Sequence, residues 1–164
     1  MSDDDATWLA TELGRTLVAQ GFRAATAESC TGGLIAGAIT AIAGSSDWFD
    51  RGFVTYSNEA KTEMLGVPAA TLAAHGAVSE TTAIAMAEGA LDRSAAAVAV
   101  AVTGIAGPGG GTPAKPVGMV CFAWARRGRD TVVTTRQLVG DRTQVRVASV
   151  SIALRGLLDI ARKT

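Results

Sequence analysis

The segment around Ser29 contains the residue types of a nucleophile site. Residues 27–33 read Ala-Glu-Ser-Cys-Thr-Gly-Gly and lie between a strand-like stretch and an apolar helical one. Backbone N–H groups at a helix start converge on one point, and small residues let a ligand approach that point closely. The segment therefore suits an anion or an oxyanion. The alternative is that Ser29 or Thr31 only caps the helix, while Gly32 and Gly33 permit a tight turn.

A nucleophilic serine needs a base, and the sequence offers two kinds. The chain has a single histidine, His75, in an Ala-Ala-His-Gly turn, so a Ser-His-Asp triad would depend entirely on that turn. Lysine is the other established partner of serine, and Lys61 ends the segment Tyr-Ser-Asn-Glu-Ala-Lys. Tyr56 could relay or orient the proton. On its own, Lys61 would be an ordinary solvated lysine.

A base role for Lys61 sets a requirement on its pKa. At the reference pKa of about 10.4, a lysine is neutral only about once in several thousand molecules at pH 7. Lowering the pKa to roughly 7 to 8 takes about 3 to 4 kcal/mol of destabilisation of the ammonium form. Burial among the many aliphatic residues, or a nearby cation, would provide it.

Cys30 is a second candidate nucleophile. A thiol at a helix start has a lowered pKa and is reactive, so a Cys30-dependent hydrolase is an alternative to a serine enzyme. Cysteine is also often an inert, buried small residue.

Two further segments could hold a ligand. Residues 103–113 read Thr-Gly-Ile-Ala-Gly-Pro-Gly-Gly-Gly-Thr-Pro and follow a buried strand, where open α/β sheets bind ligands. The loop lacks the features of an ATP or NAD fingerprint, and a flexible excursion is the alternative. Arg142 and Arg146 lie one turn apart near the start of the last helix, where an arginine holds a phosphate well. A solvated face is the simpler fate for both.

The expected binding residues come from these three segments. They are Cys30, Thr31, Gly32, Gly33, Thr103, Gly104, Ile105, Gly107 and Arg142.

Composition limits the classes of protein. The 164 residues are 48% hydrophobic and 18% charged, which favours one packed domain over residues 1–164. Fifteen basic and fifteen acidic residues balance, so we expect no nucleic-acid partner. Acidic residues near the amino terminus and the lack of a long apolar run argue against export or a membrane. Two cysteines indicate a cytoplasmic protein, and we expect no metal and no cofactor.

The elements that must position these residues alternate between helix and strand. We expect a first helix ending near Gly21, a strand over 22–27, a helix over 34–39, a strand over 53–56 and a short helix capped by Ser57 or Asn58. A helix from Ser79, a central strand over 95–103, a hairpin of 117–125 with 131–138, and a long helix from Asp141 follow. The pattern predicts an α/β fold, with one mixed sheet covered by helices on both faces.

Four of these motifs, taken in order, resemble the carboxy-terminal domain of the CinA family. They are residues 27–33, 52–61, 75–79 and 103–112, and the likeness extends over about residues 6–162. The resemblance implies nicotinamide-nucleotide amidohydrolase activity, which converts nicotinamide mononucleotide and water to nicotinate mononucleotide and ammonia in pyridine nucleotide salvage. It also implies Ser29 as nucleophile, assisted by Lys61 and Tyr56. Many CinA proteins have an amino-terminal molybdopterin-binding-like domain, which we do not expect here.

Two expectations about partners remain. An apolar α/β domain of this size is expected to form a homo-oligomer. A non-catalytic module that binds a mononucleotide but turns nothing over is the rival to an enzyme. The presence of Ser29, Tyr56 and Lys61 together argues against that rival, because a pure binder needs no nucleophile and base.

Overall fold

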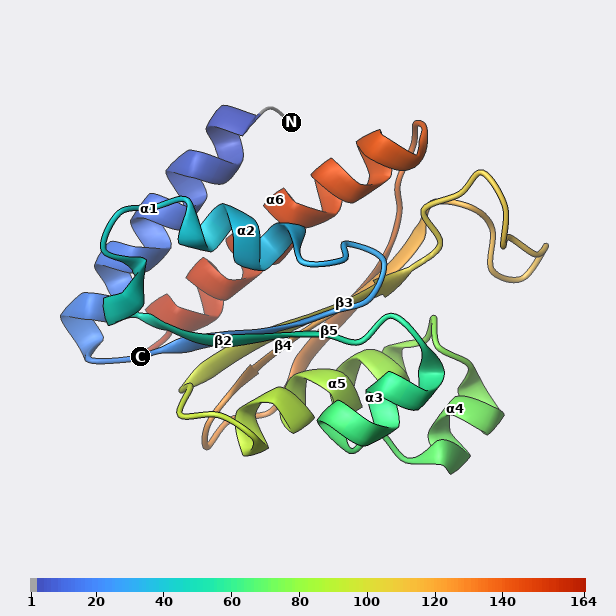
Figure 1. The fold of residues 1–164 in the computed structure, drawn as a ribbon, viewed down its shortest axis with the longest axis horizontal. Helices are drawn as coiled ribbons and strands as arrows, with labels where there is room; N and C mark the ends of the chain where they lie inside the picture. The colour runs from blue at the N-terminus through green and yellow to red at the C-terminus, as the bar shows by residue number, and fades with distance from the viewer. Residues whose placement is uncertain (1–2) are drawn as a thin grey trace.

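The computed structural model describes residues 3–164, and residues 1 and 2 lie outside the described part (Figure 1). In chain order its elements are α1 (Asp3–Gln20), β1 (Ala24–Glu28), α2 (Leu34–Thr40), the short 3-10 helix η1 (Ser45–Asp47), β2 (Phe49–Val54), α3 (Asn58–Leu65), α4 (Ala69–His75), α5 (Glu80–Asp92), β3 (Val98–Gly104), β4 (Met119–Arg126), β5 (Val132–Gln137) and α6 (Arg142–Arg162).

The described residues form one five-stranded sheet in the order β2-β1-β3-β4-β5. Strand β1 is parallel to both β2 and β3, whereas β4 runs antiparallel to β3 and to β5. The first three strands need helical crossovers because parallel neighbours cannot be joined by a tight turn. The mixed sheet and the hairpin of β4 with β5 confirm two of the expectations from the sequence.

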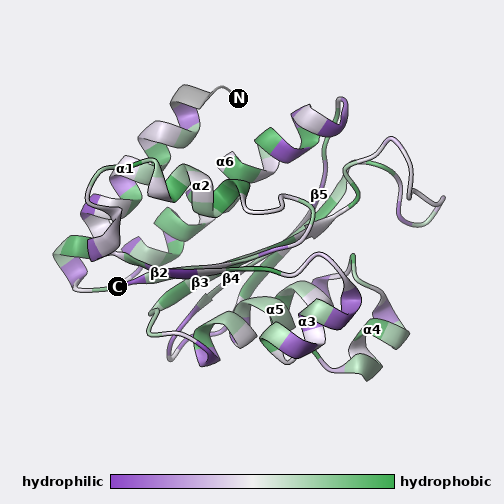
Figure 2. Ribbon diagram, in the orientation of Figure 1, coloured by the Kyte–Doolittle hydropathy of each residue, from purple (hydrophilic) through white to green (hydrophobic). Residues whose placement is uncertain are grey.

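Helices cover both faces of this sheet. Figure 1 shows α1, α2 and α6 on one face and α3, α4 and α5 on the other. The buried side chains accordingly form two clusters, one for each face. In Figure 2 the hydrophobic colours concentrate on the sheet and on the helix sides that face it. The predicted α/β/α arrangement is confirmed, and the described chain is a single α/β domain.

Strand β3 shows why an aliphatic run marks the centre of the sheet. Its residues from Val98 to Thr103 are all buried, because helices pack on both of its faces. The valines of the strand, Val98, Val100 and Val102, belong to the cluster under α1 and α6. The alternating Ala99 and Ala101 belong to the cluster under α5. The small alanines let α5 lie close to the sheet.

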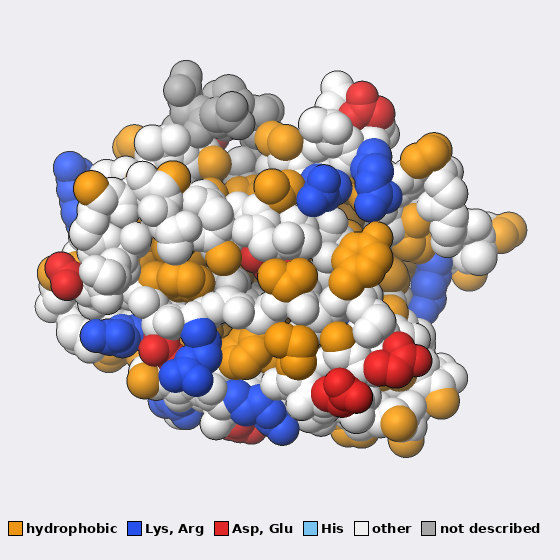
Figure 3. Space-filling model, viewed as in Figure 1, with side chains coloured by type: hydrophobic (Ala, Val, Ile, Leu, Met, Phe, Trp, Pro, Cys, Tyr) orange, Lys and Arg blue, Asp and Glu red, His pale blue; other side chains and the backbone are white. Residues whose placement is uncertain are grey.

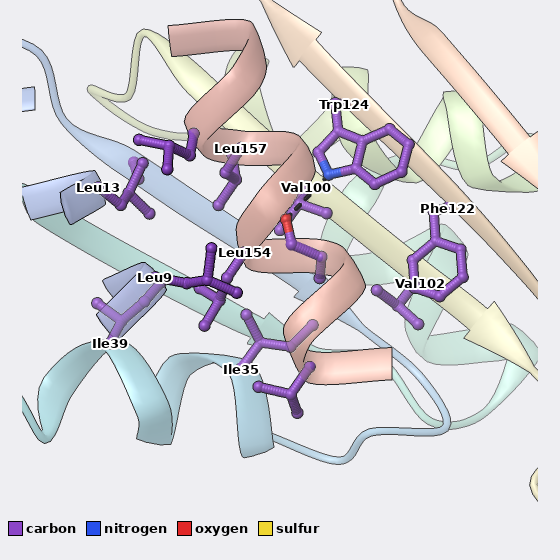
Figure 4. Close-up of a cluster of buried hydrophobic side chains, with 14 of the residues drawn as sticks. Leu9, Leu13, Ile35, Ile39, Val100, Val102, Phe122, Trp124, Leu154 and Leu157 are labelled. Carbon is purple, nitrogen blue, oxygen red and sulfur yellow. Dashed lines mark hydrogen bonds between the residues drawn. The ribbon is translucent and has the colours of Figure 1, made fainter. Parts of the chain in front are cut away.

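Aromatic side chains complete the core on the α6 face. Figure 4 shows Phe122 and Trp124 of β4 beside Val100 and Val102, with side chains of α6 opposite. The two aromatic rings are stacked, with centroids 5.8 Å apart. The Trp124 indole N–H donates to the Ala153 carbonyl at 3.0 Å, so its polar atom is satisfied inside the core.

Helix α4 corrects the expectation for the Ala-Ala-His-Gly segment. The residue types there predict a turn that contains His75, but His75 is the last residue of α4. Pro68 stands at the N-cap, and Gly76 at the C-cap adopts a positive φ of 77°. The alanine-rich segment between them favours a helix intrinsically. The turn signal therefore marked only the end of this helix.

None of the helices within residues 3–164 combines the length and the apolar character that a membrane span requires.

The carboxyl ends of β1, β2 and β3 meet at one edge of the sheet, since these strands run in the same direction. Ser29 follows β1, Thr55 and Tyr56 follow β2, and Thr103 lies at the end of β3. Open α/β sheets bind ligands at such an edge. The topology therefore gathers residues that are far apart in the sequence.

Gly89 allows α3 to approach α5 closely. A Cβ at Gly89 would overlap the carbonyl oxygen of Leu65, the last residue of α3. The obstacle is a backbone atom, which no change of rotamer could remove. The absence of a side chain at Gly89 thus determines how closely α3, which carries Lys61, packs against α5.

We predict that Gly89→Ala destabilises the protein by about 1 to 3 kcal/mol, because the overlap outweighs the better helix propensity of alanine. The matched control is Gly37→Ala in α2, where an added Cβ meets nothing within 4 Å. This control should gain about 0.5 to 1 kcal/mol. Urea denaturation measures both changes. A Gly89→Ala protein as stable as Gly37→Ala would disprove the packing argument.

Candidate active site

Ser29 lies directly after β1, where the chain turns away from the sheet. Its backbone N–H donates to the Val102 carbonyl of β3 at 2.9 Å, which continues the sheet pairing by one residue. The residue is only 8% exposed. The hydroxyl is therefore held at the sheet edge in a site that largely excludes water.

Lys61 reaches Ser29 from α3. Ser57 caps this helix by accepting the Ala60 N–H, which confirms one of the two caps predicted for it. The Lys61 side chain is fully buried, and its Nζ lies 3.0 Å from Ser29 Oγ. The same Nζ donates to the carbonyls of Thr55 at 2.7 Å and Tyr56 at 3.2 Å. Lys61 is thus far from the solvated surface lysine that its segment alone would indicate.

This geometry suits a neutral amine. A neutral amine has two N–H donors and one lone pair, which match the two shorter carbonyl contacts and the Ser29 hydroxyl, while the Ser57 carbonyl lies farther from Nζ, at 3.5 Å. Burial lowers the pKa of Lys61 from its ordinary value of 10.5, and a negative charge on Cys30 would oppose that shift. Burial and the 3.0 Å contact thus make Lys61 a candidate base for the Ser29 hydroxyl.

Tyr56 contributes through two different groups. Its backbone carbonyl accepts from Lys61, while its hydroxyl accepts from Arg142 Nη2 at 3.4 Å. The side chain is 65% exposed. Within the described chain its hydroxyl hydrogen bond goes to Arg142, not to Lys61 or Ser29. The hydrogen bonds support an orienting role through the backbone, and a proton relay through the hydroxyl stays a prediction.

His75 lies at the exposed end of α4 and takes no part in the contacts of Ser29. Its backbone carbonyl accepts a hydrogen bond from Lys115 Nζ at 2.6 Å, which ties the glycine-rich loop to α4. The hydrogen-bond partner of the Ser29 hydroxyl is Lys61. The geometry favours the serine-lysine pair over a triad built on His75.

Cys30 is buried in the core cluster on the α6 face. Burial is the largest influence on the thiol and raises its pKa to about 11, despite the opposing effects of its own backbone N–H and of nearby Arg146. A thiol with such a pKa stays protonated at neutral pH and is a poor nucleophile. The environment therefore favours Ser29 over the thiol.

Glu28 corrects the expectation that the start of α2 is open to an anion. Its carboxylate is fully buried and accepts from the Ile35 N–H at 3.0 Å and the Ala36 N–H at 3.1 Å. It also accepts from the Thr31 hydroxyl at 2.6 Å. The protein thus supplies its own anion at this helix end. An anionic ligand near this helix end would therefore have to accept hydrogen bonds from other N–H groups.

The turn between β1 and α2 leaves such groups available. Within residues 3–164, the N–H groups of Cys30 and Thr31 have no acceptor on another residue. Gly32 and Gly33 follow with φ angles of 57° and 105°, which only glycine adopts readily. These glycines turn the chain into α2, while the two preceding N–H groups stay beside Ser29.

Residues 103–107, predicted to bind a ligand, make hydrogen bonds and close packing contacts within the protein itself. The Thr103 hydroxyl donates to the Ala77 carbonyl at 2.8 Å. A Cβ on Gly104 would clash with Val120 of β4. The Ile105 N–H donates to the Met119 carbonyl at 2.9 Å. Sheet pairing thus occupies the Ile105 N–H, so this group is not free to donate to a ligand.

The two arginines of α6 point to different places. Asp141 caps the helix in a capping box with Gln144, as predicted for Asp141. Arg142 is exposed and donates to the Gly107 carbonyl at 2.7 Å, so it links α6 to the glycine-rich loop. Arg146 donates instead to the Cys30 and Thr31 carbonyls, at 3.0 and 3.3 Å. Of these two arginines, only Arg142 lies at the surface beside Tyr56.

Charged side chains are unevenly distributed over the surface around Arg142 and Tyr56. Figure 3 shows basic side chains over the start of α6 and acidic side chains over α3, with hydrophobic side chains between them. Tyr56 and Val54 are among the exposed large hydrophobic residues of the protein. The surface near Ser29 therefore offers a cation and an apolar platform side by side.

A cavity of about 520 Å³ lies elsewhere, between α6 and β5. Its walls include Trp124, Arg136 and Ser151, and none of the predicted site residues. Within residues 3–164, no three His, Cys, Asp or Glu side chains are grouped to hold a metal ion. The chemistry of the serine-lysine contact, rather than cavity size, makes this edge of the sheet the candidate site.

Comparison with known proteins decides the family. Residues 6–161 match the family model described as the CinA C-terminal domain. The chain belongs to the CinA family. It is 50% identical to the nicotinamide-nucleotide amidohydrolase PncC of Escherichia coli K12, over 96% of this chain and 95% of that protein. The crystal structure of a competence/damage inducible protein from Agrobacterium tumefaciens superposes with a TM-score of 0.94, at 52% identity and 96% coverage of both chains.

Other members of the CinA family are longer. A CinA-like protein of Akkermansia muciniphila is 58% identical over 90% of this chain, which spans 36% of that protein's length. A relative from Symbiobacterium thermophilum is 57% identical, and the chain spans 37% of it. The same domain thus occurs both in proteins of this length and within longer chains.

Sequence reasoning missed Glu28 and Arg146 as residues of this site. Glu28 stood inside the 27–33 motif, and an acidic residue just before a helix start was the available signal. Arg146 was noted only with Arg142 as a possible phosphate ligand. Its contact with the Cys30 and Thr31 carbonyls spans more than a hundred residues of chain, so local pattern could not reveal it.

We predict that Glu28→Gln destabilises the protein by about 1 to 3 kcal/mol, because the new amide group cannot accept from all three donors. The matched control is Glu63→Gln on the exposed face of α3, which should change stability by less than about 0.5 kcal/mol. Urea denaturation of both variants tests this. Equal stabilities would show that Glu28 does not hold the start of α2.

Proposed function

We propose that this chain hydrolyses the carboxamide of nicotinamide mononucleotide, giving nicotinate mononucleotide and ammonia. The observation that carries the proposal is the 3.0 Å contact of Lys61 Nζ with Ser29 Oγ in a buried site. The near full-length similarity to an Escherichia coli nicotinamide-nucleotide amidohydrolase supports the choice of substrate. Serine and lysine together provide the nucleophile and the base that amide hydrolysis needs.

In the first step Ser29 Oγ attacks the carboxamide carbon while the neutral Lys61 amine takes the hydroxyl proton. The tetrahedral intermediate then collapses, and the C–N bond breaks. Lys61 returns the proton to the departing nitrogen, so that ammonia leaves. Ser29 remains as an ester of the nicotinate group.

In the second step water attacks this ester, and the Lys61 amine accepts a proton from the water. Collapse of the second intermediate returns that proton to Ser29 Oγ and releases the acid. The carbonyls of Thr55 and Tyr56 keep the amine aimed at the serine throughout both steps. No metal or cofactor enters this scheme.

The N–H groups of Cys30 and Thr31 are our candidates for stabilising the oxyanion. They follow the nucleophile directly, and the N–H after the nucleophile has this role in other serine hydrolases. Neither group has an acceptor on another described residue. One good donor of this kind contributes about 3 to 4 kcal/mol to the barrier reduction.

Arg142 is our candidate for the 5′-phosphate. It is exposed at the start of α6, and its guanidinium already lies between the Gly107 carbonyl and the Tyr56 hydroxyl. A guanidinium beside a helix start pairs well with a phosphate. The exposed Tyr56 ring beside it offers a flat surface to the substrate.

We also infer one amidohydrolase domain over residues 1–164, while a homo-oligomer and a cytoplasmic location stay predictions.

We predict that Ser29→Ala and Lys61→Met abolish ammonia release from nicotinamide mononucleotide, with losses of at least about a thousandfold. Cys30→Ala should stay active, because it keeps its backbone N–H. Lys163→Met, which removes an exposed lysine near the carboxyl end, is the matched control and should leave the rate unchanged. An ammonia assay measures all four. Full activity in Ser29→Ala would reject the proposal.

The same assay separates the rival functions. Loss of activity in Cys30→Ala, together with inactivation by iodoacetamide, would favour a thiol hydrolase. A rise in melting temperature with nicotinamide mononucleotide, without any ammonia from the wild type, would favour a binding module.

We predict that kcat/KM rises with pH through the pKa of Lys61, because the neutral amine is the reactive form. Burial lowers that pKa, so the midpoint should lie below 10.5. Rates of ammonia release across the pH range test this. A midpoint near the ordinary histidine value of about 6.5 that vanishes in His75→Ala would assign the base to His75 instead.

A further inference from the structure

The guanidinium of Arg146 spans two successive carbonyls of the turn that carries the nucleophile. Nε donates to the Cys30 carbonyl at 3.0 Å, and Nη2 donates to the Thr31 carbonyl at 3.3 Å. The Thr31 carbonyl also accepts the Leu34 N–H at 3.0 Å. Arg146 thus connects the second turn of α6 to the two residues after Ser29.

The planarity of the peptide bond gives these contacts a consequence. In a trans peptide the C=O and N–H groups point in opposite directions. The peptide that joins Cys30 to Thr31 has its carbonyl held by Arg146, so its N–H points away from the guanidinium. The preceding peptide joins Ser29 to Cys30. Its carbonyl is held by the backbone instead, since the Ser29 carbonyl accepts the Gly32 N–H at 3.1 Å. The two N–H groups without an acceptor on another residue belong to these peptides.

The surroundings of Arg146 favour a guanidinium at this position. Gly32 lies under it, with a Cβ position 3.4 Å from Arg146 Nη2 and a φ of 57°. A rigid planar fork matches two neighbouring carbonyls, whereas an ammonium would bind one of them as a point charge. Arg146 is half-buried and its described hydrogen bonds go to the turn after Ser29, whereas those of exposed Arg142 go to the Gly107 carbonyl and the Tyr56 hydroxyl.

We propose that Arg146 is a positioning residue of the hydrolase, which clamps the Cys30 and Thr31 carbonyls so that the N–H groups after Ser29 stay aligned for the oxyanion. It does not touch the substrate. The inference rests on the proposed function, because it presumes an oxyanion formed by attack of Ser29. It also gives the two arginines of α6 different roles: Arg146 positions the turn after Ser29, and Arg142 binds the phosphate.

We predict that Arg146→Ala lowers kcat by about 10- to 100-fold with little change in KM, since misalignment weakens oxyanion donors that are individually worth about 100- to 1,000-fold. Arg142→Ala, the matched variant one helical turn away, should instead mainly raise KM for nicotinamide mononucleotide. Arg146→Lys should fall between wild type and Arg146→Ala. Added guanidinium chloride at non-denaturing concentration should restore part of kcat to Arg146→Ala and none to Ser29→Ala.

A second readout keeps this inference apart from the choice of substrate. In a fluorophosphonate probe, Ser29 Oγ displaces fluoride from phosphorus, and the phosphoryl oxygen occupies the position of the oxyanion. Labelling of Arg146→Ala should be at least about tenfold slower than that of Arg142→Ala. If the wild type released no ammonia from nicotinamide mononucleotide, the proposed function would fail while labelling still tested the clamp.

Three outcomes would overturn the role of Arg146. They are an unchanged kcat in Arg146→Ala, a rise in KM without a fall in kcat, and equal labelling of the two arginine variants. If Arg146→Ala does not fold, Arg146→Lys decides by the same ratios, with thermal melting as the check on folding. Wild-type rates in that lysine variant would reject the fork geometry.

Discussion

The candidate site depends on the burial and hydrogen bonding of the Lys61 amino group. A lysine loses much of its hydration when it is fully buried, and this loss favours the neutral form that a base requires. The carbonyls of Thr55 and Tyr56 accept hydrogen bonds from that amino group at 2.7 and 3.2 Å, and Ser29 Oγ lies 3.0 Å from it. Burial and hydrogen bonding together thus convert an ordinary surface residue type into a partner for a serine hydroxyl.

The rest of the fold brings the lysine and the serine together. Strand β1 delivers Ser29, strand β2 delivers the two carbonyls, and the packing of α3 on α5 at Gly89 sets the depth of Lys61. The three parallel strands end at the same edge, so each contribution arrives from a different segment at one place. A change in the packing of α5 would therefore alter the contact between Lys61 and Ser29, although α5 carries no residue of the candidate site.

Charged groups around the nucleophile divide into those that hold the protein and those that face outward. Glu28 neutralises the start of α2 from inside, so that helix end no longer serves a ligand. Arg146 binds carbonyls of the turn, and Arg142 lies at the surface beside Tyr56. This division fits the proposed function, in which a chain with no net charge binds an anionic nucleotide through a local cation.

The sequence by itself determined the α/β class, the mixed sheet, the β4 and β5 hairpin and the segments that carry Ser29 and Lys61, because hydrophobic periodicity and turn residues are local signals. It did not reveal α4, whose alanines lack a distinctive pattern, or the use of the Ile105 N–H by the sheet. Only the tertiary structure decided that Lys61 is buried, that Glu28 fills the start of α2 and that Arg146 turns inward. These features depend on contacts between segments distant in the chain, and no local pattern encodes such contacts.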